Sequence, residues 1–200
     1  MSEVDASIVL IGPTGSGKSS VGKELAAILD WPLVELDDLR KQWYPEFGLP
    51  TEAESEAVAR GGLLELIATW KPYELQSVER VITEYPTGTV IAFGGGQSVY
   101  VDSAQIERAR AALSVAGRVI LLLPSDDRDT CLRILQDRLR HEPVFAEAAD
   151  PEAFLRDFTP ILKMQIQSES NVLIATEIIV TGQSTPHELA HHIAATRDPE

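Results

Sequence analysis

Residues 12–19 read GPTGSGKS, a complete phosphate-binding loop of the pattern G-x-x-x-x-G-K-[ST]. Glycines let such a loop turn its N–H groups toward phosphate oxygens, and the helix that follows adds the positive end of its dipole. Lys18 supplies a charge for the β- and γ-phosphates, and Ser19 supplies a hydroxyl for Mg²⁺. The chain is therefore predicted to bind a nucleoside triphosphate with Mg²⁺. The residues assigned to nucleotide binding are Gly12, Thr14, Gly15, Ser16, Gly17, Lys18, Ser19 and Ser20.

The segments around the loop have the secondary structure that it requires. Residues 7–11 form a short apolar run typical of a buried strand, and apolar residues recur at helical spacing after Lys18. A strand entering the loop and a helix leaving it favour a true phosphate site over a chance Gly-Ser turn.

Strand and helix signals alternate along the rest of the chain. This alternation predicts an α/β fold, a three-layer α/β/α arrangement with a five-stranded parallel sheet, in a single domain over residues 1–200. Ligands of such sheets bind at the carboxyl ends of the strands. The predicted strands are residues 7–11, 33–36, 89–93, 118–124 and 172–180. The predicted helices are residues 18–29, 52–68, 73–84, 103–115, 126–139, 151–168 and 186–195.

The composition restricts the partners. The formal net charge of −14 disfavours nucleic acid and anionic membranes, because such a surface repels phosphate groups. No apolar run reaches the roughly 18 residues of a membrane span, and the acidic N-terminus does not resemble a signal peptide, so we expect a cytoplasmic protein. The single cysteine, Cys131, lies in a helical stretch and is expected to be a core residue.

Acidic residues follow the second predicted strand. Glu35 and Asp37 are two positions apart, so we expect their side chains on the same face of the strand end. Beside a triphosphate, a carboxylate can hold Mg²⁺ through water or accept a proton from an attacking hydroxyl. Asp38 is predicted to cap a helix that begins near Leu39. The alternative is that all three carboxylates are solvated loop residues.

Gly94, Gly95 and Gly96 end the third predicted strand. They can serve a tight turn alone, but they also let a ligand lie directly on the backbone. We favour the ligand interpretation, because the phosphate loop, the acidic residues and the glycines all follow strands and should converge on one cleft.

In this order, the segments GPTGSGKSS, VELDD and IAFGGGQSV resemble the shikimate kinase family of small P-loop kinases. The resemblance implies that Glu35 helps to hold the metal through water and that Asp37 contacts the acceptor hydroxyl as its base. It also implies that the backbone of Gly94, Gly95 and Gly96 touches the acceptor. A helical acceptor-binding insert is expected at about residues 38–85, and a lid at about residues 132–150.

The lid contains three arginines to which the resemblance gives roles. It implies that Arg133 lies against adenine, and that Arg138 or Arg140 reaches the transferring phosphate. Such a lid would supply positive charge to the transition state and exclude water. The alternative for each arginine is a solvated helix face.

The arginines with which this family grips its acceptor are missing. The region of the family's F-R motif reads Trp70-Lys71-Pro72, and Phe158 stands where the R-x-P-L-Y motif has its arginine. Because a buried carboxylate without a cationic partner is costly, these departures argue against shikimate as the acceptor.

Two groups of side chains leave alternatives open. The aromatic residues of the insert either cover an acceptor or pack the insert itself; they are Trp43, Tyr44, Phe47, Trp70 and Tyr73. His187 and His191 are spaced for a metal on the last helix, but a polar helix face is favoured because no acidic or cysteine partner has a fitting spacing.

The sequence favours an ATP-dependent kinase that phosphorylates a hydroxyl of a small metabolite other than shikimate. The alternative is a nucleotide-binding regulatory or assembly protein with little transfer activity, which the missing arginines would permit but Lys18 and Asp37 disfavour. A kinase for nucleotides or nucleic-acid ends is disfavoured by the acidic surface. The expected partners are ATP and a small hydroxylated metabolite, with no nucleic acid and no membrane.

Overall fold

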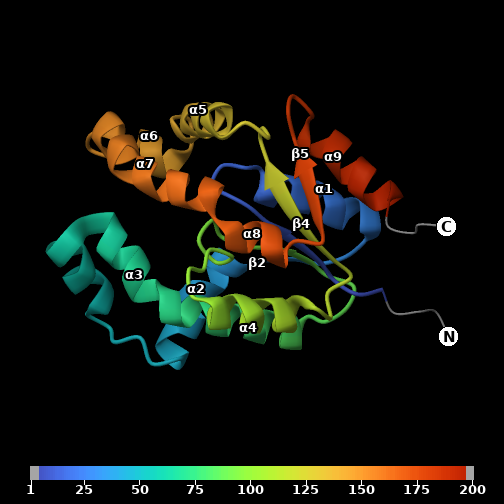
Figure 1. Ribbon diagram of the computed structural model, residues 1–200, viewed down its shortest axis with the longest axis horizontal. Coiled ribbons are helices and arrows are strands. Elements are labelled where there is room, and N and C mark those ends of the chain that lie inside the picture. Colours follow the sequence, from blue (N-terminus) through green and yellow to red (C-terminus); the bar gives the residue numbers. More distant parts are fainter. Residues whose placement is uncertain (1–4, 197–200) are drawn as a thin grey trace.

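The computed structural model describes residues 5–196, and its centre is a five-stranded sheet in the order β2-β3-β1-β4-β5. All neighbouring strands are parallel. Helices cover both faces of the sheet (Figure 1), which confirms the predicted three-layer α/β/α fold. The strands are β1 (Ile8–Ile11), β2 (Leu33–Glu35), β3 (Val90–Ala92), β4 (Arg118–Leu123) and β5 (Glu177–Val180). The helices are α1 (Lys18–Leu29), α2 (Leu36–Glu46), α3 (Ala53–Glu84), α4 (Ser103–Leu113), α5 (Arg128–Leu139), α6 (Pro143–Ala146), α7 (Pro151–Gln167), α8 (Glu169–Ile174) and α9 (Pro186–Ala195).

The central strand β1 shows how the sheet is held between its helices. Ile8 and Leu10 pack in one core cluster with residues of α1 and α9. Val9 and Ile11 point the other way, into a second cluster with residues of α3 and α4. Alternate residues of a strand face opposite sides, so a run that is apolar throughout is suited to a sheet covered on both faces.

A third cluster joins α5, α6 and α7 outside these two layers. It contains Cys131, Leu135, Phe145 and Leu162, which confirms Cys131 as a buried core residue. Figure 1 shows α6, α7 and the first part of α3 extending beyond the sheet on the same side of the molecule.

The start of α2 differs from the prediction. The second strand ends at Glu35 and the helix begins at Leu36, so Asp37 and Asp38 both lie in its first turn. The predicted cap by Asp38 is therefore wrong: Glu35 occupies the cap position and no side chain caps the helix. The reason is that Leu36, Leu39 and Trp43 recur at helical spacing and all pack on the core, which extends the helix back to Leu36.

The long helix α3 also differs from the prediction of two helices with a break between residues 68 and 73. The helical segment continues through Pro72 and is interrupted instead at Gly61 and Gly62, whose backbone angles are non-helical. At Gly62 φ is 65°, which glycine adopts without the strain that a side chain would cause.

The last predicted strand, residues 172–180, is only half correct. Its first part belongs to the short helix α8, and β5 begins at Glu177. Ser170, Asn171 and Ile174 are buried on one side of α8 at helical spacing. An apolar run of this length does not by itself distinguish a strand from a helix that leads into one.

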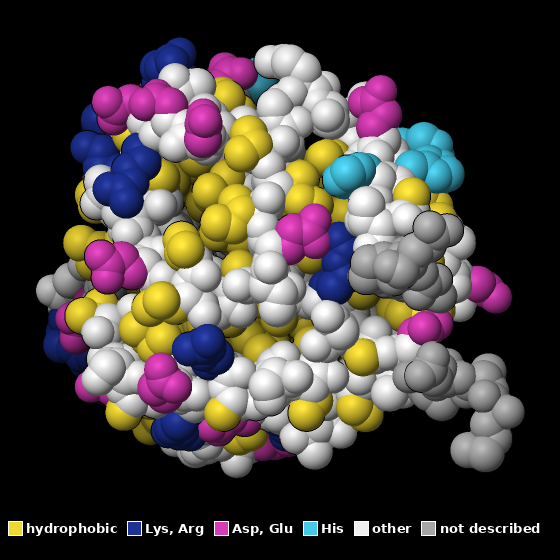
Figure 2. All heavy atoms as spheres, turned by 45° about the vertical axis from the view of Figure 1, so that its right-hand side comes forward, with side chains coloured by type: hydrophobic (Ala, Val, Ile, Leu, Met, Phe, Trp, Pro, Cys, Tyr) yellow, Lys and Arg dark blue, Asp and Glu magenta, His cyan; other side chains and the backbone are white. Residues whose placement is uncertain are grey.

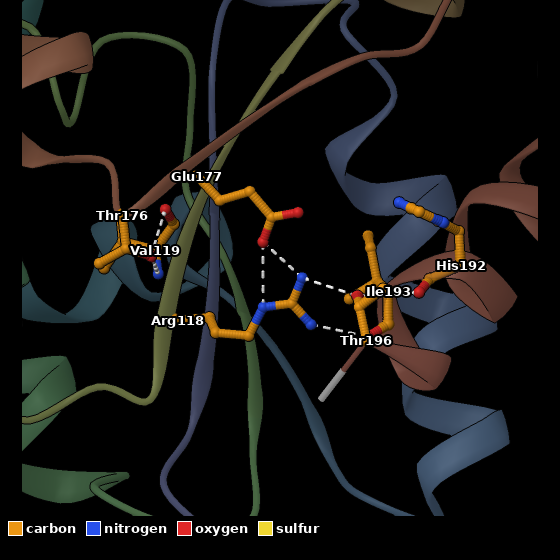
Figure 3. Close-up of polar contacts among 7 residues, drawn as sticks. All are labelled: Arg118, Val119, Thr176, Glu177, His192, Ile193 and Thr196. Atoms are coloured by element: carbon orange, nitrogen blue, oxygen red, sulfur yellow. Dashed lines mark hydrogen bonds and ion pairs between the residues drawn. The ribbon is translucent and has the colours of Figure 1, made fainter. Parts of the chain in front are cut away.

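Arg118 ties the starts of β4 and β5 to the end of α9 (Figure 3). Its guanidinium donates to Glu177 Oε2 from Nη2 at 2.5 Å and from Nε at 3.1 Å, and to the carbonyl oxygen of Ile193 at 2.7 Å. It also reaches the hydroxyl of Thr196 at 3.2 Å. This network lies at the amino end of the sheet, opposite the end where ligands of parallel sheets bind.

Hydrophobic side chains gather on the face of the molecule that carries α8 and β5 (Figure 2). Val172 and Leu173 of α8 and Ile178 and Val180 of β5 are each about half exposed. None of the helices within residues 5–196 combines the length and the apolar character needed to cross a membrane.

Candidate active site

A cleft of about 780 Å³ opens at the carboxyl ends of the strands. The phosphate loop and the start of α1 line it, together with Asp37 and residues 93–95. The three segments predicted to converge therefore do so, although Glu35 and Gly96 are not part of the lining. The remaining walls come from the predicted lid and from the loop after β5 with the start of α9. They are formed by Asp137, Arg138, Leu139, His141, Glu142, Val144, Phe145, Thr181, Ser184, Pro186 and Leu189.

The phosphate loop is held in its curved shape by its own backbone. Gly12 has φ 139°, and a Cβ there would overlap the carbonyl oxygen of Leu122 in β4. Lys18 Nζ donates to the carbonyl oxygens of Gly12 at 2.9 Å and Pro13 at 2.8 Å. Because Lys18 is buried, loss of solvation lowers the pKa of its ammonium to about 8.

The loop also holds polar atoms that are not used within the protein. The hydroxyl of Ser16 is buried and has no hydrogen-bond partner within residues 5–196. An orphaned hydroxyl in a ring of backbone N–H groups is suited to a phosphate oxygen. The loop therefore fits a polyphosphate.

A side chain from the far end of the sequence fixes this loop. Gln165 of α7 is buried, and its Oε1 accepts the N–H of Thr14 at 2.9 Å. Asn171 Nδ2 in turn donates to the carbonyl oxygen of Gln165 at 2.9 Å. The sequence analysis missed Gln165; the signal was a polar residue on the apolar face of a helix, in register with Leu155 and Leu162.

Asp37 lies in the first turn of α2, against the backbone of Gly94. A Cβ at Gly94 would overlap the carboxylate of Asp37. Gln97 spans the same junction: its Oε1 accepts the N–H of Gly94 at 2.6 Å, and its Nε2 donates to Asp37 Oδ1 at 3.4 Å. Asp37 is an exposed residue that lines the cleft, yet loss of solvation among the surrounding protein atoms raises the pKa of its carboxyl, and the positive charges of Arg40 and Lys18 oppose that rise.

The three glycines after β3 mark a crossing point of four segments. Beside Gly94 lies Asp37; beside Gly95 lie Thr14 and Gln165; beside Gly96 lies the carboxylate of Glu74. Contacts with other protein atoms are thus enough to explain why these three positions are glycines, and no ligand is needed for that explanation. Contact of these three glycines with an acceptor stays a prediction.

Glu35 ends β2 and is half-buried outside the cleft lining. Its negative charge acts on Asp37, whose carboxyl pKa it helps to raise. Its predicted role at the metal through water has no direct geometric counterpart and stays a prediction.

The lid arginines occupy different environments. Arg138 lines the cleft, and its Nη1 donates to the carbonyl oxygen of Gly15 at 3.2 Å. Arg140 is exposed and pairs with Glu152 at 3.1 Å, while Arg133 is exposed and donates to Thr130 at 2.8 Å. Of the three arginines, only Arg138 is brought to the phosphate loop.

Two cations to which the sequence analysis gave no role lie near Asp37 and Gly96, outside the described cleft lining. Lys71 Nζ is 2.5 Å from Glu74 Oε2 and donates to the carbonyl oxygen of Gly96 at 2.6 Å. Arg40 of α2 stacks on the ring of Trp70, with its Cζ 4.1 Å from the ring centroid. The signal for Arg40 was its spacing of three residues from Asp37 on a helix.

In the described chain, the aromatic residues of the insert do not line the cleft, and part of them packs on the core of the sheet rather than within the insert. Trp43 and Tyr44 are almost fully buried, and Phe47 packs on the same core as Trp43. Tyr73 contacts Tyr44, with ring centroids 5.7 Å apart. The described part of the cleft lining contains none of these residues.

The wall between β5 and α9 was not assigned from the sequence. Thr181, Ser184 and Pro186 line the cleft there, and the hydroxyl of Thr181 is buried without a hydrogen-bond partner in the described chain. The signal was their place directly after the fifth strand.

Oxygen donors suited to Mg²⁺ are present in the cleft. Ser19 lines it with an exposed hydroxyl, and Asp37 supplies a carboxylate. Residues 5–196 hold no cluster of three or more His, Cys, Asp or Glu side chains arranged for a metal. His187 instead pairs with Glu24 at 2.9 Å. The site therefore fits a cation that takes most of its ligands from phosphate and water.

Comparison with known proteins agrees with this geometry. A family model described as an AAA domain matches residues 8–161. The shikimate kinase of Salinispora arenicola is 29% identical over 190 residues, which cover 94% of this chain and 95% of that protein. The pentafunctional AROM polypeptide of Schizosaccharomyces pombe is 35% identical over 95 residues, but they cover only 46% of this chain and 5% of that polypeptide.

Solved structures show the same fold. The shikimate kinase from Acinetobacter baumannii, solved in complex with shikimate, aligns with a TM-score of 0.59 at 21% identity, covering 95% of this chain and 91% of that one. A gluconokinase from Sinorhizobium meliloti aligns with a TM-score of 0.56 at 16% identity, covering 98% and 93%. The fold is thus the P-loop kinase fold that shikimate kinases share.

Proposed function

This chain belongs to the AAA domain family of P-loop proteins, and on that premise we propose that it is a kinase that transfers the γ-phosphoryl group of ATP to a hydroxyl of a small metabolite. The observation that carries the proposal is the meeting of Asp37 and the phosphate loop in one cleft. Phosphoryl transfer needs a cradle for the triphosphate and a carboxylate at the attacking hydroxyl. A protein that only binds nucleotide has no need of the second.

A bound triphosphate would accept hydrogen bonds from side chains that now donate to the backbone of the phosphate loop. Lys18 donates to the carbonyl oxygens of Gly12 and Pro13, and Arg138 donates to that of Gly15. Phosphate oxygens are stronger acceptors than carbonyls, because they carry charge. Both cations would therefore turn to the β- and γ-phosphates, with the unpartnered hydroxyl of Ser16 as a further donor.

Mg²⁺ would be held by Ser19 and by phosphate oxygens, and would neutralise charge on the transferring group. The nucleotide base would lie at the end of the cleft lined by Thr181 and Ser184. Arg133, which the family resemblance places on adenine, lies outside the cleft lining, so Thr181 is the better candidate. These roles, like the predicted cytoplasmic location, are part of the proposal.

Asp37 would accept the proton of the attacking hydroxyl. Its raised carboxyl pKa makes it a stronger base than a solvated aspartate. Gln97 and Gly94 hold it in place from the far side. The acceptor is proposed to differ from shikimate, because the region of the family's F-R motif holds no arginine here, and its one cation, Lys71, is already paired with Glu74.

The test is ADP release from Mg-ATP with a panel of hydroxylated metabolites. Shikimate, quinate, gluconate, sugars, cyclitols and hydroxy amino acids are compared, with Lys18→Ala as the blank. A large rise with one compound, absent from the blank, is expected. A flat panel with intact ATP binding would contradict the proposal and favour a nucleotide-binding regulatory protein.

A further inference from the structure

Arg40 is the one partly buried cation of the described chain that makes no hydrogen bond or ion pair. Six Lys and Arg side chains within residues 5–196 are buried or half-buried. Five of them donate to protein oxygens: Lys18, Lys71, Arg80, Arg118 and Arg138. The contact found for Arg40 is the face of Trp70. Withdrawing a guanidinium from water without giving it an acceptor is unfavourable, so this arrangement needs an explanation.

The stacking on Trp70 fixes the plane of the guanidinium. Its Cζ lies 4.1 Å from the ring centroid. The indole is itself held, because its Nε1 donates to Glu54 Oε1 at 2.7 Å. A stacked guanidinium keeps its N–H groups free along its edge, in the fork that matches a carboxylate or phosphate.

The position of Arg40 connects it to the proposed base. Arg40 and Asp37 are three residues apart on α2, a spacing that puts Cβ atoms about 5–6 Å apart on one side of a helix. The charge of Arg40 acts on Asp37 more strongly than that of Lys18, and it also acts on Glu74 of α3. The guanidinium therefore lies where α2 and α3 meet, one turn along α2 from Asp37, which lines the cleft, whereas Arg40 stands behind that lining.

The neighbouring cation does not compete for this role. Lys71 is paired with Glu74 and bonded to Gly96, so its charge is already balanced. Of the two cations near Asp37 and Gly96, Arg40 alone keeps its donors for another molecule.

We propose that Arg40 binds an anionic oxygen group of the acceptor while Asp37 receives the hydroxyl. The acceptor class is then a hydroxylated carboxylate or phosphate ester, rather than a neutral sugar or polyol. This inference rests on the proposed kinase function. The anionic group would be bound by Arg40, one turn after Asp37 on α2. Shikimate, which the related kinases hold with arginines at other positions, would therefore fit poorly.

The test uses acceptors that differ only in the anionic group. The pairs are gluconate with sorbitol, quinate with myo-inositol, and glycerate or glycerol 3-phosphate with glycerol. ADP release is measured for the full chain, for Arg40→Gln and for Lys41→Gln, which removes the same charge from the next, exposed position. Binding of each compound is also measured by calorimetry with a non-hydrolysable Mg-ATP analogue.

We expect the anionic member of the accepted pair to have the higher kcat/KM. Arg40→Gln should raise its KM or Kd by about tenfold to a hundredfold, the usual range for a lost bond to a charged group. Lys41→Gln should leave both values within about twofold. The glycerate and glycerol 3-phosphate arms decide between carboxylate and phosphate.

Other outcomes separate this inference from the proposed function. Transfer to neutral compounds, or an anion preference that survives in Arg40→Gln, would overturn the inference and leave the kinase intact. Binding of an anionic compound that depends on Arg40, with no ADP release, would support the inference and contradict the kinase. If no anionic compound of the panel binds or reacts, the inference is wrong.

Discussion

The side chain of Gln165 accepts the backbone N–H of Thr14 at 2.9 Å, across 151 positions of the chain. This bond joins α7, which packs on α5, to the phosphate loop. The side-chain amide of Gln165 also lies beside Gly95. The loop after β3 therefore contacts the phosphate loop and α7 at the same point. The shape of the phosphate loop therefore depends on a helix that follows the predicted lid.

Replacing Gln165 with leucine should destabilise the protein. The N–H of Thr14 would lose its acceptor in a partly buried position, which costs about 1–3 kcal/mol. Urea denaturation should show this loss, and calorimetry should show weaker Mg-ATP binding. Gln167→Leu, at an exposed position of the same helix, should change stability by less than about 0.5 kcal/mol. Equal effects of the two variants would contradict a specific role for the bond.

Asp37→Asn should separate catalysis from binding. The amide keeps the shape of the carboxylate but cannot accept the proton, so kcat should fall by about a hundredfold or more. The Kd of Mg-ATP should stay within about threefold, because the phosphate loop is unchanged. Asp38→Asn, at the exposed neighbouring position, is the control and should keep its activity. A parallel loss of turnover and nucleotide binding in Asp37→Asn would show that Asp37 is structural.

The parts of this site that the sequence predicts are those set by local pattern. The phosphate loop is a contiguous motif, and Asp37 and Gly94 each follow a strand of a parallel sheet, so their meeting at one cleft follows from topology. Asp37 was nevertheless expected on a strand end, whereas the buried Leu36 starts the helix before it.

Contacts between distant helices could not be predicted in this way. The stacking of Arg40 on Trp70 depends on how α2 packs against α3, and the bond of Gln165 depends on where α7 ends. The sequence shows that the expected arginines are missing, but only the packing shows that Arg40 stacks on Trp70 and that Lys71 is bonded to Gly96.

The two candidate lid arginines should differ in their importance. Arg138 contacts the phosphate loop, whereas Arg140 pairs with an exposed glutamate. Arg138→Ala should lower kcat by about a hundredfold or more, the range found when a positioned transition-state donor is removed. Arg140→Ala should change kcat by less than about threefold, because exposed ion pairs contribute little. A larger effect at Arg140 would contradict this assignment and would mean that Arg140, rather than Arg138, contacts the phosphate when nucleotide is bound.

The affinity for Mg-ATP should fall as the pH rises through about 8, because burial lowers the pKa of Lys18 to about 8. Below that pH, Lys18 is charged both before and after binding, and it contributes no pH dependence. Above it, the free protein has lost the proton, while the bound triphosphate restores the pKa toward the ordinary lysine value. Binding must then take up a proton, so the affinity should drop by up to about tenfold per pH unit.

Calorimetry in buffers of different ionisation enthalpy would detect this uptake directly. At pH 9 the observed heat should vary with the buffer, and at pH 7 it should not. Lys18→Met binds more weakly, but its affinity should lack the fall above pH 8, since no ammonium remains to titrate. If the fall persists in Lys18→Met, another group is responsible, and the burial of Lys18 does not control the nucleotide site.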